Sequence, residues 1–437
     1  MDFRGNAFDE EDCYTILENH IKNESAIYKS HELNAISTVE GLIGRYYKLK
    51  ILYETDDRQK ELHLFLKELN TPNNVLQYLL DSIKAYDKEA FYYNCLLTEF
   101  KSNNICVDFA PKCYYCRPSL LVFEDLVLRG FKNSPKRDML DMKHCKVALK
   151  ALAKFHAATA SYEKLKSNEG KSLLQLYPQF LDDTLFGDIK NAATEWLECT
   201  FRGLLDLIDH LPEDEISADE YKAKLIEAME LQDPDQFARY KCTVLHGDLW
   251  SNNFMFEYKN GVPINSILID YQIIKYGPIA LDVVQMVITN MRRNVRKVHY
   301  EELLSYYYHQ FVEACEENNF QALDFISYKD FMQCCEEVKI LAKMQCAADH
   351  SVTFLLDKTL QEAMITEESL RNFLFENRSK SILESYNEDT VYREVVTEDL
   401  IELRDLLFNT RDVKVPSKWT CFVVGGLGYG IRLASGS

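Results

Sequence analysis

Hydrophobic and polar positions follow two different periods along the chain. Residues 47–53 place tyrosine, leucine, isoleucine and tyrosine at alternate positions, the period of two expected of a β-strand. Residues 119–126 are rich in β-forming side chains and predict a second strand that ends at an acidic pair. Residues 143–163 carry apolar side chains at helical spacing, and residues 172–232 and 282–410 continue as amphipathic helices. The pattern predicts a mixed first segment of about 125 residues followed by a mostly helical remainder.

One short region interrupts the helical pattern. Residues 253–258 and 264–270 both have the composition of strands, and Lys259-Asn260-Gly261 separates them. Asn-Gly between two apolar runs is typical of a tight β-hairpin, because both residues accept the positive φ of the turn. We therefore expect a β-hairpin inside the helical part of the chain, with polar residues at both of its ends.

Composition and charge narrow the class of protein. The chain has 437 residues, with 50 Lys and Arg against 69 Asp and Glu, which gives a formal net charge of −19. An acidic balance disfavours surfaces that bind nucleic acid or anionic membranes, because those need basic side chains against phosphate. The hydrophobic content of 47% indicates a protein that builds a core. The chain shows no secretory signal and no membrane-spanning run, so we expect a cytoplasmic protein.

Cysteine usage agrees with that expectation. The 13 cysteines of an unsecreted chain are expected to be reduced, and most of them to be small core residues. Cys113 and Cys116 form the one Cys-x-x-Cys pair, and no second such pair completes a tetrahedral zinc site. No metal or redox function is assigned to this pair.

The predicted hairpin is flanked by a constellation of polar residues that can carry chemistry. Asp248 lies five residues before Asn253, and Asp270 ends the second predicted strand. This order is the spacing of a kinase catalytic loop and metal site. A carboxylate at Asp248 can orient an acceptor hydroxyl and take its proton. Asn253 and Asp270 offer the oxygen ligands that Mg²⁺ prefers. Each residue alone fits an ordinary polar turn, but the joint spacing favours the catalytic interpretation.

Three sequence blocks resemble the ecdysteroid kinase-like family, also called CHK kinase-like, of the choline kinase and aminoglycoside phosphotransferase group. They are His246-Gly-Asp-Leu-Trp-Ser-Asn-Asn253, Leu268-Ile-Asp270-Tyr-Gln272 and Tyr276-Gly-Pro-Ile-Ala-Leu-Asp282. The resemblance implies that Asp282 and His246 support the catalytic loop. It also implies ATP and Mg²⁺ as cofactors. A protein substrate is the less expected choice, because Gln272 stands where protein kinases have the glycine of Asp-Phe-Gly.

The resemblance also implies the residues that bind the nucleotide. Gly41 and Gly44 match the loop that covers the phosphates, although an ordinary turn before a strand explains two glycines almost as well. Lys67 matches the lysine that pairs with the phosphates, and Glu89 its carboxylate partner. The residues around Lys67 also fit the apolar stripe of a surface helix, so only the resemblance favours this role. The main chain of the connector between lobes is implied to bind adenine, through Phe123, Glu124 and Asp125.

The same resemblance defines the expected fold and domain organisation. The fold class is α+β, a bilobal protein-kinase-like fold with a small β-rich lobe and a large, mostly helical lobe. We expect the nucleotide-binding lobe in residues 1–124 and the catalytic and substrate-binding lobe in residues 125–420. Residues 421–437 are rich in glycine and are expected to form a flexible tail.

The function expected from the sequence is transfer of the γ-phosphate of ATP to a hydroxyl group of a small molecule. The resemblance points first to an ecdysteroid or a similar hydroxylated steroid or foreign compound. A choline- or ethanolamine-type kinase is the alternative within enzymes, because an acidic pocket suits a cationic head group. A non-catalytic, pseudokinase-like binding protein is the alternative from another class. A small-molecule alcohol is the expected partner, and no obligate protein partner is evident.

Overall fold

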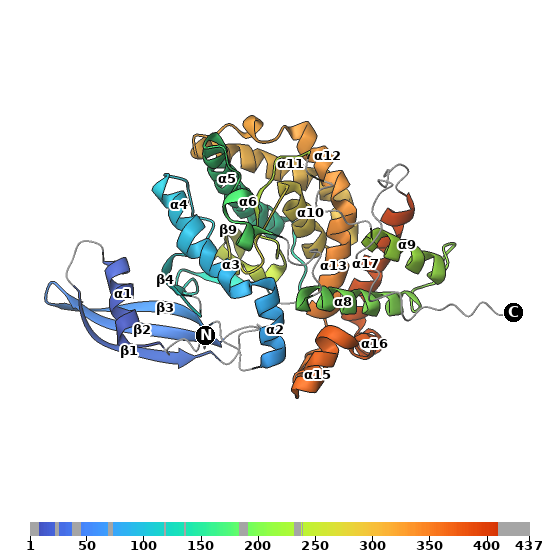
Figure 1. Cartoon of the computed structure of the whole chain (residues 1–437), viewed down its shortest axis with the longest axis horizontal. Helices are drawn as coiled ribbons and strands as arrows, with labels where there is room; N and C mark the ends of the chain where they lie inside the picture. Colours follow the sequence, from blue (N-terminus) through green and yellow to red (C-terminus); the bar gives the residue numbers. More distant parts are fainter. Residues whose placement is uncertain are drawn as a thin grey trace. The chain divides into compact units, whose positions relative to one another are not determined.

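The structure is a computed structural model that describes residues 8–21, 26–36, 45–68, 73–117, 119–134, 137–182, 191–230, 237 and 239–409. Figure 1 shows the helices and strands of the chain with their labels. The chain divides into two compact units. The first comprises residues 1–182 and 242–332, and the second comprises residues 183–241 and 333–437. The predicted division into two lobes at residue 124 is based on the family resemblance and not on compactness, so these units do not test it and it stays a prediction. The predicted tail, 421–437, lies outside the described residues.

The first unit begins with a five-stranded antiparallel sheet of order β1-β2-β3-β5-β4. The alternation predicted for residues 47–53 is confirmed, because Leu49, Ile51 and Tyr53 are buried on one face of β2. The helix α1 packs against that face through Cys13 and Ile16, in one apolar cluster with β2, β3 and β5. The elements are α1 Glu10–His20, β1 Ile27–Ala35, β2 Arg45–Thr55, β3 Arg58–Glu68, β4 Cys113–Arg117 and β5 Leu120–Glu124.

The residues around Lys67 form a strand, so the surface-helix interpretation of this stretch is wrong. Leu62, Leu64 and Leu66 are buried on the same face of β3, at the period of two. The strand lies between β2 and β5, with Lys67 opposite Tyr46 on one side. Pairing on both edges satisfies the backbone groups of β3 and places it in the middle of the sheet. The lysine is consequently buried, with 5% of its surface exposed.

Helices make up most of the remainder of the first unit. The helix predicted over residues 143–163 is confirmed as α5, which Asp141 caps by accepting hydrogen bonds from the first backbone N–H groups. The helix α11 packs along α5. The helices are α2 Asn74–Ile83, α3 Ala85–Phe91, the π-helical η1 Tyr92–Leu96, α4 Leu97–Ser102, α5 Met142–Asn168, α6 Leu173–Leu176, α7 Pro178–Leu181, α10 Ile279–Asn290, α11 Arg293–Glu317 and η4 Ala322–Asp324.

The predicted hairpin is present in the first unit. The strands β8 and β9 pair in antiparallel register, with Phe254 opposite Leu268. Asn260 and Gly261 both have positive φ, 54° and 76°, as a tight hairpin turn requires. The second strand ends at Leu268, two residues before the predicted end at Asp270. The elements are β6 Phe131–Asn133, β7 Thr243–Leu245, η3 Ser251–Asn253, β8 Phe254–Lys259, β9 Val262–Leu268 and β10 Lys275–Gly277.

The second unit is helical in its described residues, as the amphipathic pattern predicts. The helices α13 and α17 pack along each other in its core, and α9 contacts α17. Its helices are α8 Ala192–Ile208, α9 Ala218–Glu230, α13 Lys339–Thr353, α14 Asp357–Ala363, α15 Glu367–Arg371, η5 Asn372–Glu376, α16 Ser379–Glu388 and α17 Thr390–Asn409, with α12 Tyr328–Glu337 crossing the unit boundary. In the described part of the chain, no helix combines the length and the apolar character that crossing a membrane requires.

Candidate active site

The first unit brings three predicted site residues together around one buried ammonium group. The Nζ atom of Lys67 lies 2.8 Å and 3.1 Å from the two carboxylate oxygens of Glu89. The same Nζ lies 2.7 Å from Oδ1 of Asp270. Lys67 comes from β3, Glu89 from α3 and Asp270 from the residues after β9, so three distant segments meet at this point. The sequence positions 67, 89 and 270 therefore belong to one constellation.

The electrostatics of this constellation favour a charged lysine. Burial alone lowers the pKa of Lys67, but the carboxylates of Asp270 and Glu89 outweigh burial and raise that pKa above its ordinary value. Asp270 is the most accessible member, with 25% of its side chain exposed against 1% for Glu89. Its backbone has a φ of 69°, a left-handed conformation that costs free energy for a residue other than glycine. The constellation is therefore a fixed arrangement of charges whose most accessible member is the carboxylate of Asp270.

The predicted catalytic loop is held by hydrogen bonds between its own members. The Nδ2 group of Asn253 donates to Oδ2 of Asp248 at 2.8 Å and to the carbonyl oxygen of Asp248 at 2.9 Å. The backbone N–H of Ile269 donates to the carbonyl oxygen of Asn253 at 3.0 Å, which joins the loop to the end of β9. Asp248 and Asn253 are thus fixed relative to each other, and Asp270 follows directly after the backbone contact.

Asp282, in the first turn of α10, holds the backbone of this loop by hydrogen bonds. Its carboxylate accepts hydrogen bonds from the backbone N–H groups of His246 at 2.7 Å and Gly247 at 3.1 Å. The ring of His156, on α5, lies 3.1 Å from the same carboxylate and 2.7 Å from the hydroxyl of Tyr307. Burial opposes ionisation of Asp282, but His156 and His246 outweigh it and lower the pKa of Asp282. A buried carboxylate therefore fixes the backbone just before Asp248.

His246 lies fully buried with both ring nitrogens engaged. Its Nε2 group donates to the carbonyl oxygen of Ile269 at 3.1 Å, and its Nδ1 accepts from the backbone N–H of Asp248 at 3.4 Å. Burial lowers the pKa of His246, although Asp282 and Asp270 oppose that shift. The neutral ring is the form that these two hydrogen bonds require. His246 accordingly ties the loop to the residues before Asp270.

The structure does not test the other residues that the sequence predicts to bind the nucleotide. Gly41 and Gly44 lie outside the described residues. Phe123 is in the middle of the sheet, while the backbone N–H of Glu124 donates to the carbonyl oxygen of Lys112 and the carbonyl oxygen of Asp125 accepts from Leu128. The side chain of Asp125 pairs with Lys48 at 2.7 Å. Adenine binding by residues 123–125 stays a prediction.

Several residues that organise the site have no predicted role. Asn290, on α10, donates to the carbonyl oxygen of Leu249 at 2.6 Å and thereby holds the catalytic loop. The ring of Tyr92, in the π-helix after Glu89, stacks on Tyr271 with centroids 3.7 Å apart. A π-helical turn frequently occurs at functional sites, but it leaves little trace in the sequence. Asn290 is buried among apolar residues of α10. A polar amide within an apolar helical run is the sequence feature that could have identified it, because buried amides are usually hydrogen-bonded.

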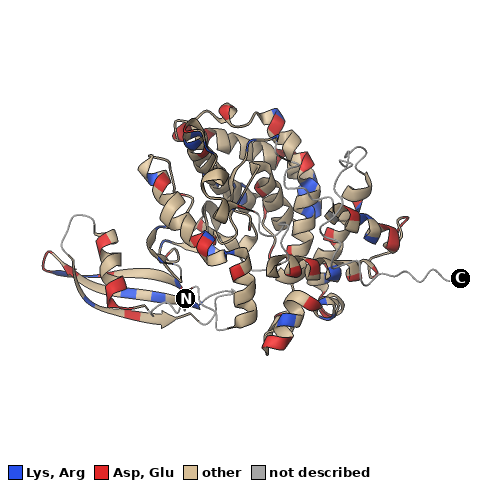
Figure 2. Cartoon of the chain, viewed as in Figure 1, with Lys and Arg blue, Asp and Glu red and all other residues tan. Residues whose placement is uncertain are grey.

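The acidic charge of the chain is distributed over many elements and does not identify a cation-binding pocket. Acidic positions occur on α1, α9 and α15 among others (Figure 2). The net charge of −19 therefore gives no separate support to a cationic substrate.

Three features together define a kinase-like protein: a buried ion pair between a lysine of a small antiparallel sheet and a glutamate of the helix α3, a loop with Asp and Asn five residues apart, and a hairpin followed by an Asp. The chain belongs to the ecdysteroid kinase-like family, whose sequence profile matches residues 39–320. The resemblance and the α+β kinase-like fold predicted from the sequence are thereby confirmed. Membership supports a small-molecule kinase that phosphorylates an alcohol group.

Solved structures of small-molecule kinases are among the structural matches. An ethanolamine kinase of Plasmodium vivax is 14% identical over 84% of this chain and 85% of that chain, with a TM-score of 0.41. A choline kinase of Streptococcus pneumoniae is 11% identical over 86% and 98% of the two chains, with a TM-score of 0.37. TM-scores below 0.5 do not establish a shared fold, so the assignment of the fold is based on the family match and on the geometry above. No curated protein matches the sequence significantly.

Proposed function

We propose that this protein is an ATP- and Mg²⁺-dependent kinase that transfers the γ-phosphate to a hydroxyl group of an ecdysteroid or a similar hydroxylated steroid or foreign compound. The observation that carries the proposal is the double ion pair of Lys67 with Glu89 and Asp270, in the same compact unit as the hydrogen-bonded pair Asp248 and Asn253. Family membership supports phosphotransfer to a small-molecule alcohol. The steroid acceptor rests on the character of the family alone.

The donor set before and after the hairpin fits Mg²⁺. Asn253 uses its amide nitrogen for Asp248, which leaves the amide oxygen as a neutral ligand. Asp270 adds a charged oxygen ligand with an accessible side chain. Amide and carboxylate oxygens are the hard ligands that Mg²⁺ selects. Bound at this position, Mg²⁺ supplies charge neutralisation for the terminal phosphates of ATP.

The proposed roles of the other side chains are to orient the acceptor, to bind the phosphates and to hold the catalytic loop. Asp248 orients the acceptor hydroxyl and takes its proton as the bond to phosphorus forms. Lys67 holds the phosphates by its charge, and Glu89 fixes the position of that ammonium group. Asp282 and His246 keep the backbone of the catalytic loop in place. Because a loose phosphoryl transition state needs little covalent help, positioning and electrostatics account for most of the catalysis. Gly41, Gly44 and the main chain of residues 123–125 complete the proposed nucleotide site.

The base assignment is tested by Asp248→Asn. We expect phosphate transfer to fall by about 10³-fold, because the amide cannot accept the proton, while the affinity for ATP changes little. The measurement is transfer from radiolabelled ATP to a panel of ecdysteroids, choline, ethanolamine and aminoglycosides. A matched control is Asp108→Asn, which makes the same chemical change at an exposed aspartate of the first unit. Near-normal turnover by Asp248→Asn overturns its role as base.

The panel also decides between acceptors. Transfer to the steroid alcohols alone supports the proposal, and transfer to choline or ethanolamine alone replaces it with a cationic-alcohol kinase. ATP binding without transfer to any member of the panel favours a pseudokinase-like binding protein.

The metal assignment is tested separately by Asp270→Ala. Removing a charged ligand is expected to abolish the Mg²⁺-dependent part of ATP binding, because Asn253 alone is a weak neutral ligand. Calorimetric titration of ATP with and without Mg²⁺ measures this difference. An unchanged Mg²⁺ dependence counts against Asp270 as a ligand.

A further inference from the structure

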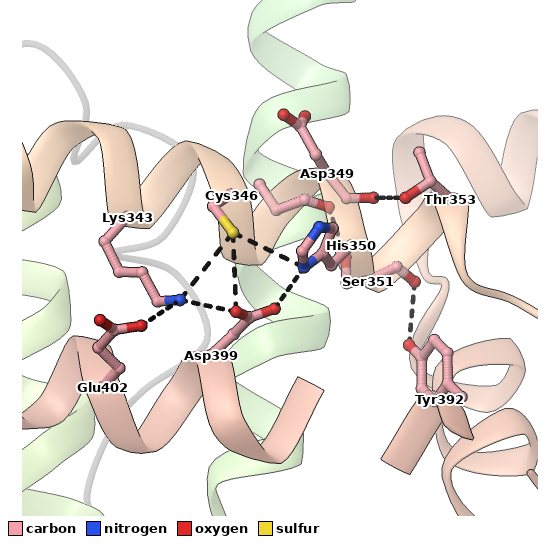
Figure 3. A network of polar contacts seen from close by, with 10 residues as sticks. Lys343, Cys346, Asp349, His350, Ser351, Thr353, Tyr392, Asp399 and Glu402 are labelled. Carbon is pink, nitrogen blue, oxygen red and sulfur yellow. Dashed lines mark hydrogen bonds and ion pairs between the residues drawn. The ribbon is translucent and has the colours of Figure 1, made fainter. Parts of the chain in front are cut away.

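The helices α13 and α17 of the second unit enclose a cluster of buried side chains that carry metal-binding atoms (Figure 3). Cys346 and His350 lie one helical turn apart on α13, and Asp399 lies on α17. The Sγ atom of Cys346 is 3.6 Å from Nδ1 of His350 and 3.6 Å from Oδ1 of Asp399. The Nδ1 atom of His350 is 2.7 Å from Oδ2 of Asp399. The three ligand atoms therefore converge on one point in the core of this unit.

The separations are close to those of a tetrahedral zinc site. A thiolate, an imidazole nitrogen and a carboxylate oxygen are all common zinc ligands. Around a zinc ion with Zn–S of about 2.3 Å and Zn–N of about 2.0 Å, the sulfur and nitrogen atoms lie about 3.6 Å apart. Cys346 and His350 already have that spacing, and an i, i+4 pair on one helix face is a known zinc-binding arrangement. Asp399 has to withdraw from His350 by only about 0.7 Å.

The neighbouring charges accommodate a divalent cation without leaving an excess. Lys343 lies 2.7 Å from Oδ1 of Asp399 and 2.7 Å from Oε2 of Glu402. Because Lys343 occupies Oδ1, the second oxygen of Asp399 is the one directed at His350. A divalent ion with one thiolate and one carboxylate is neutral, and the pair of Lys343 with Glu402 is neutral as well. Such a balance avoids the cost of an uncompensated charge in a buried site.

We propose that Cys346, His350 and Asp399 bind a Zn²⁺ ion through Sγ, Nδ1 and Oδ2, with a water molecule as the fourth ligand, and that this ion joins α13 to α17. The metal replaces the proton of the thiol and the proton shared between His350 and Asp399, and both protons pass to solvent. The thiolate ligand excludes Mg²⁺, which takes oxygen ligands. The site is independent of the proposed kinase reaction, because it lies in the second unit and uses none of the residues assigned to that reaction.

Metal analysis of the full-length, untagged chain tests this site. Protein purified under reducing conditions and dialysed against Zn²⁺ at about 10 µM, which is well above the dissociation constants of about 10⁻⁷ M or lower of structural zinc sites, is expected to hold about one zinc ion per chain. Cys346→Ser is expected to lower this content at least about fivefold, because the thiolate supplies the strongest ligand. The matched control is Cys335→Ser, which removes another fully buried thiol and is expected to keep the zinc. Circular dichroism verifies that each variant is folded.

A second measurement uses the wild-type chain and does not depend on the folding of a variant. Co²⁺ in place of Zn²⁺ is expected to give the near-ultraviolet charge-transfer band of a cobalt–thiolate bond. Zinc-edge anomalous diffraction is expected to show a peak between Cys346, His350 and Asp399. A wild-type protein that takes up no zinc overturns the proposal. So does a zinc content that Cys346→Ser leaves unchanged, or an anomalous peak at another position.

Discussion

Each unit of the molecule contains a buried lysine between two carboxylates, and the contact distances are nearly the same. In the first unit, Lys67 lies 2.8 Å from Glu89 and 2.7 Å from Asp270. In the second unit, Lys343 lies 2.7 Å from both of its carboxylate partners, Asp399 and Glu402 (Figure 3). Distances alone therefore do not distinguish a candidate nucleotide-binding group from a group inside a helical core.

The difference lies in where the carboxylates come from and how far they are exposed. The partners of Lys343 lie one turn apart on α17, and their side chains are 5% exposed for Asp399 and 16% for Glu402. The partners of Lys67 come from two distant segments, and one quarter of the Asp270 side chain is exposed, 25%. A more closed ion cluster fixes the arrangement of two packed helices without necessarily adding net stability, whereas a cluster with a more accessible carboxylate leaves a direction from which a ligand can enter. The comparison predicts a functional role for the first lysine and a structural role for the second.

The largest expected effect comes from removing each lysine in turn. Lys67→Met is expected to reduce phosphate transfer by about 10³-fold, because the phosphates lose their fixed cation. In Lys343→Met, the buried carboxylate of Asp399 and the partly buried carboxylate of Glu402 lose the lysine, while Asp399 keeps His350 as a partner. We expect a loss of about 3–5 kcal/mol in the free energy of unfolding. Steady-state kinetics and urea unfolding measure the two quantities for both variants.

The comparison predicts that the two variants differ in phosphate transfer rather than in stability, because Lys67→Met also leaves a buried carboxylate, that of Glu89, without its cation. Lys343→Met assayed well below its unfolding temperature is expected to keep most of the phosphate transfer. If Lys343→Met loses as much turnover as Lys67→Met while still folded, the division into a functional and a structural lysine is wrong.

A smaller effect is expected from the backbone just before Asp248, in the predicted catalytic loop of the first unit. Gly247 has a φ of 82°, and a Cβ atom on it would lie 2.5 Å from the carbonyl oxygen of Ile273. Gly261, in the hairpin turn, has a φ of 76° but no atom within 4 Å of an added Cβ. Gly247→Ala is therefore expected to cost about 2–4 kcal/mol in the free energy of unfolding, and Gly261→Ala only about 1 kcal/mol. Thermal and urea unfolding of the two variants measure the part of the destabilisation that comes from the clash of the added Cβ at Gly247. Equal losses of unfolding free energy in both variants would contradict that clash.

Local patterns in the sequence predicted the parts of the site that are close together along the chain. The hairpin follows from Asn260 and Gly261, whose backbone conformation is set by the two residues themselves. The spacing from Asp248 to Asn253 also lies within one loop, which the side chain of Asn253 closes. Such features depend on neighbouring residues only, and the family resemblance adds their chemical meaning.

Contacts between distant segments were not accessible to the same reasoning. Leu62, Leu64 and Leu66 fit a strand, yet together with their neighbours they also fit a helical stripe, and only pairing with β2 and β5 decides between the two. Lys343 has the appearance of a surface lysine on an amphipathic helix, because its partner Asp399 lies 56 positions further along the chain. A charged side chain can be buried when a distant residue of opposite charge packs against it. The pattern of hydrophobic and polar positions along the sequence does not show which residue that is.

The smallest expected effect concerns pH and a buried histidine beside each lysine cluster. Burial lowers the pKa of His246, so the folded state binds this proton less readily than the unfolded state. Its contribution to stability is present above the unfolded pKa near 6.5 and is lost as the pH falls below that value. Burial alone would also lower the pKa of His350, but Cys346 and Asp399 raise it well above its ordinary value. In metal-free protein its contribution is therefore present below pH 6.5 and is lost as the pH rises toward the folded pKa.

The two histidines are therefore expected to act in opposite directions on the pH dependence of unfolding. Between pH 5.5 and 7.5, a window of about one unit on each side of an ordinary histidine pKa, His246→Asn should flatten the rise of stability with pH. His350→Gln, in chelator-treated protein, should remove an opposing fall. Each change in slope is at most about 1.4 kcal/mol per pH unit, the limit for one proton. Urea unfolding at several pH values measures both slopes. Slopes that change in the same direction would show that the two buried histidines do not differ in charge, and the contrast between an open and a closed cluster would then rest on exposure alone.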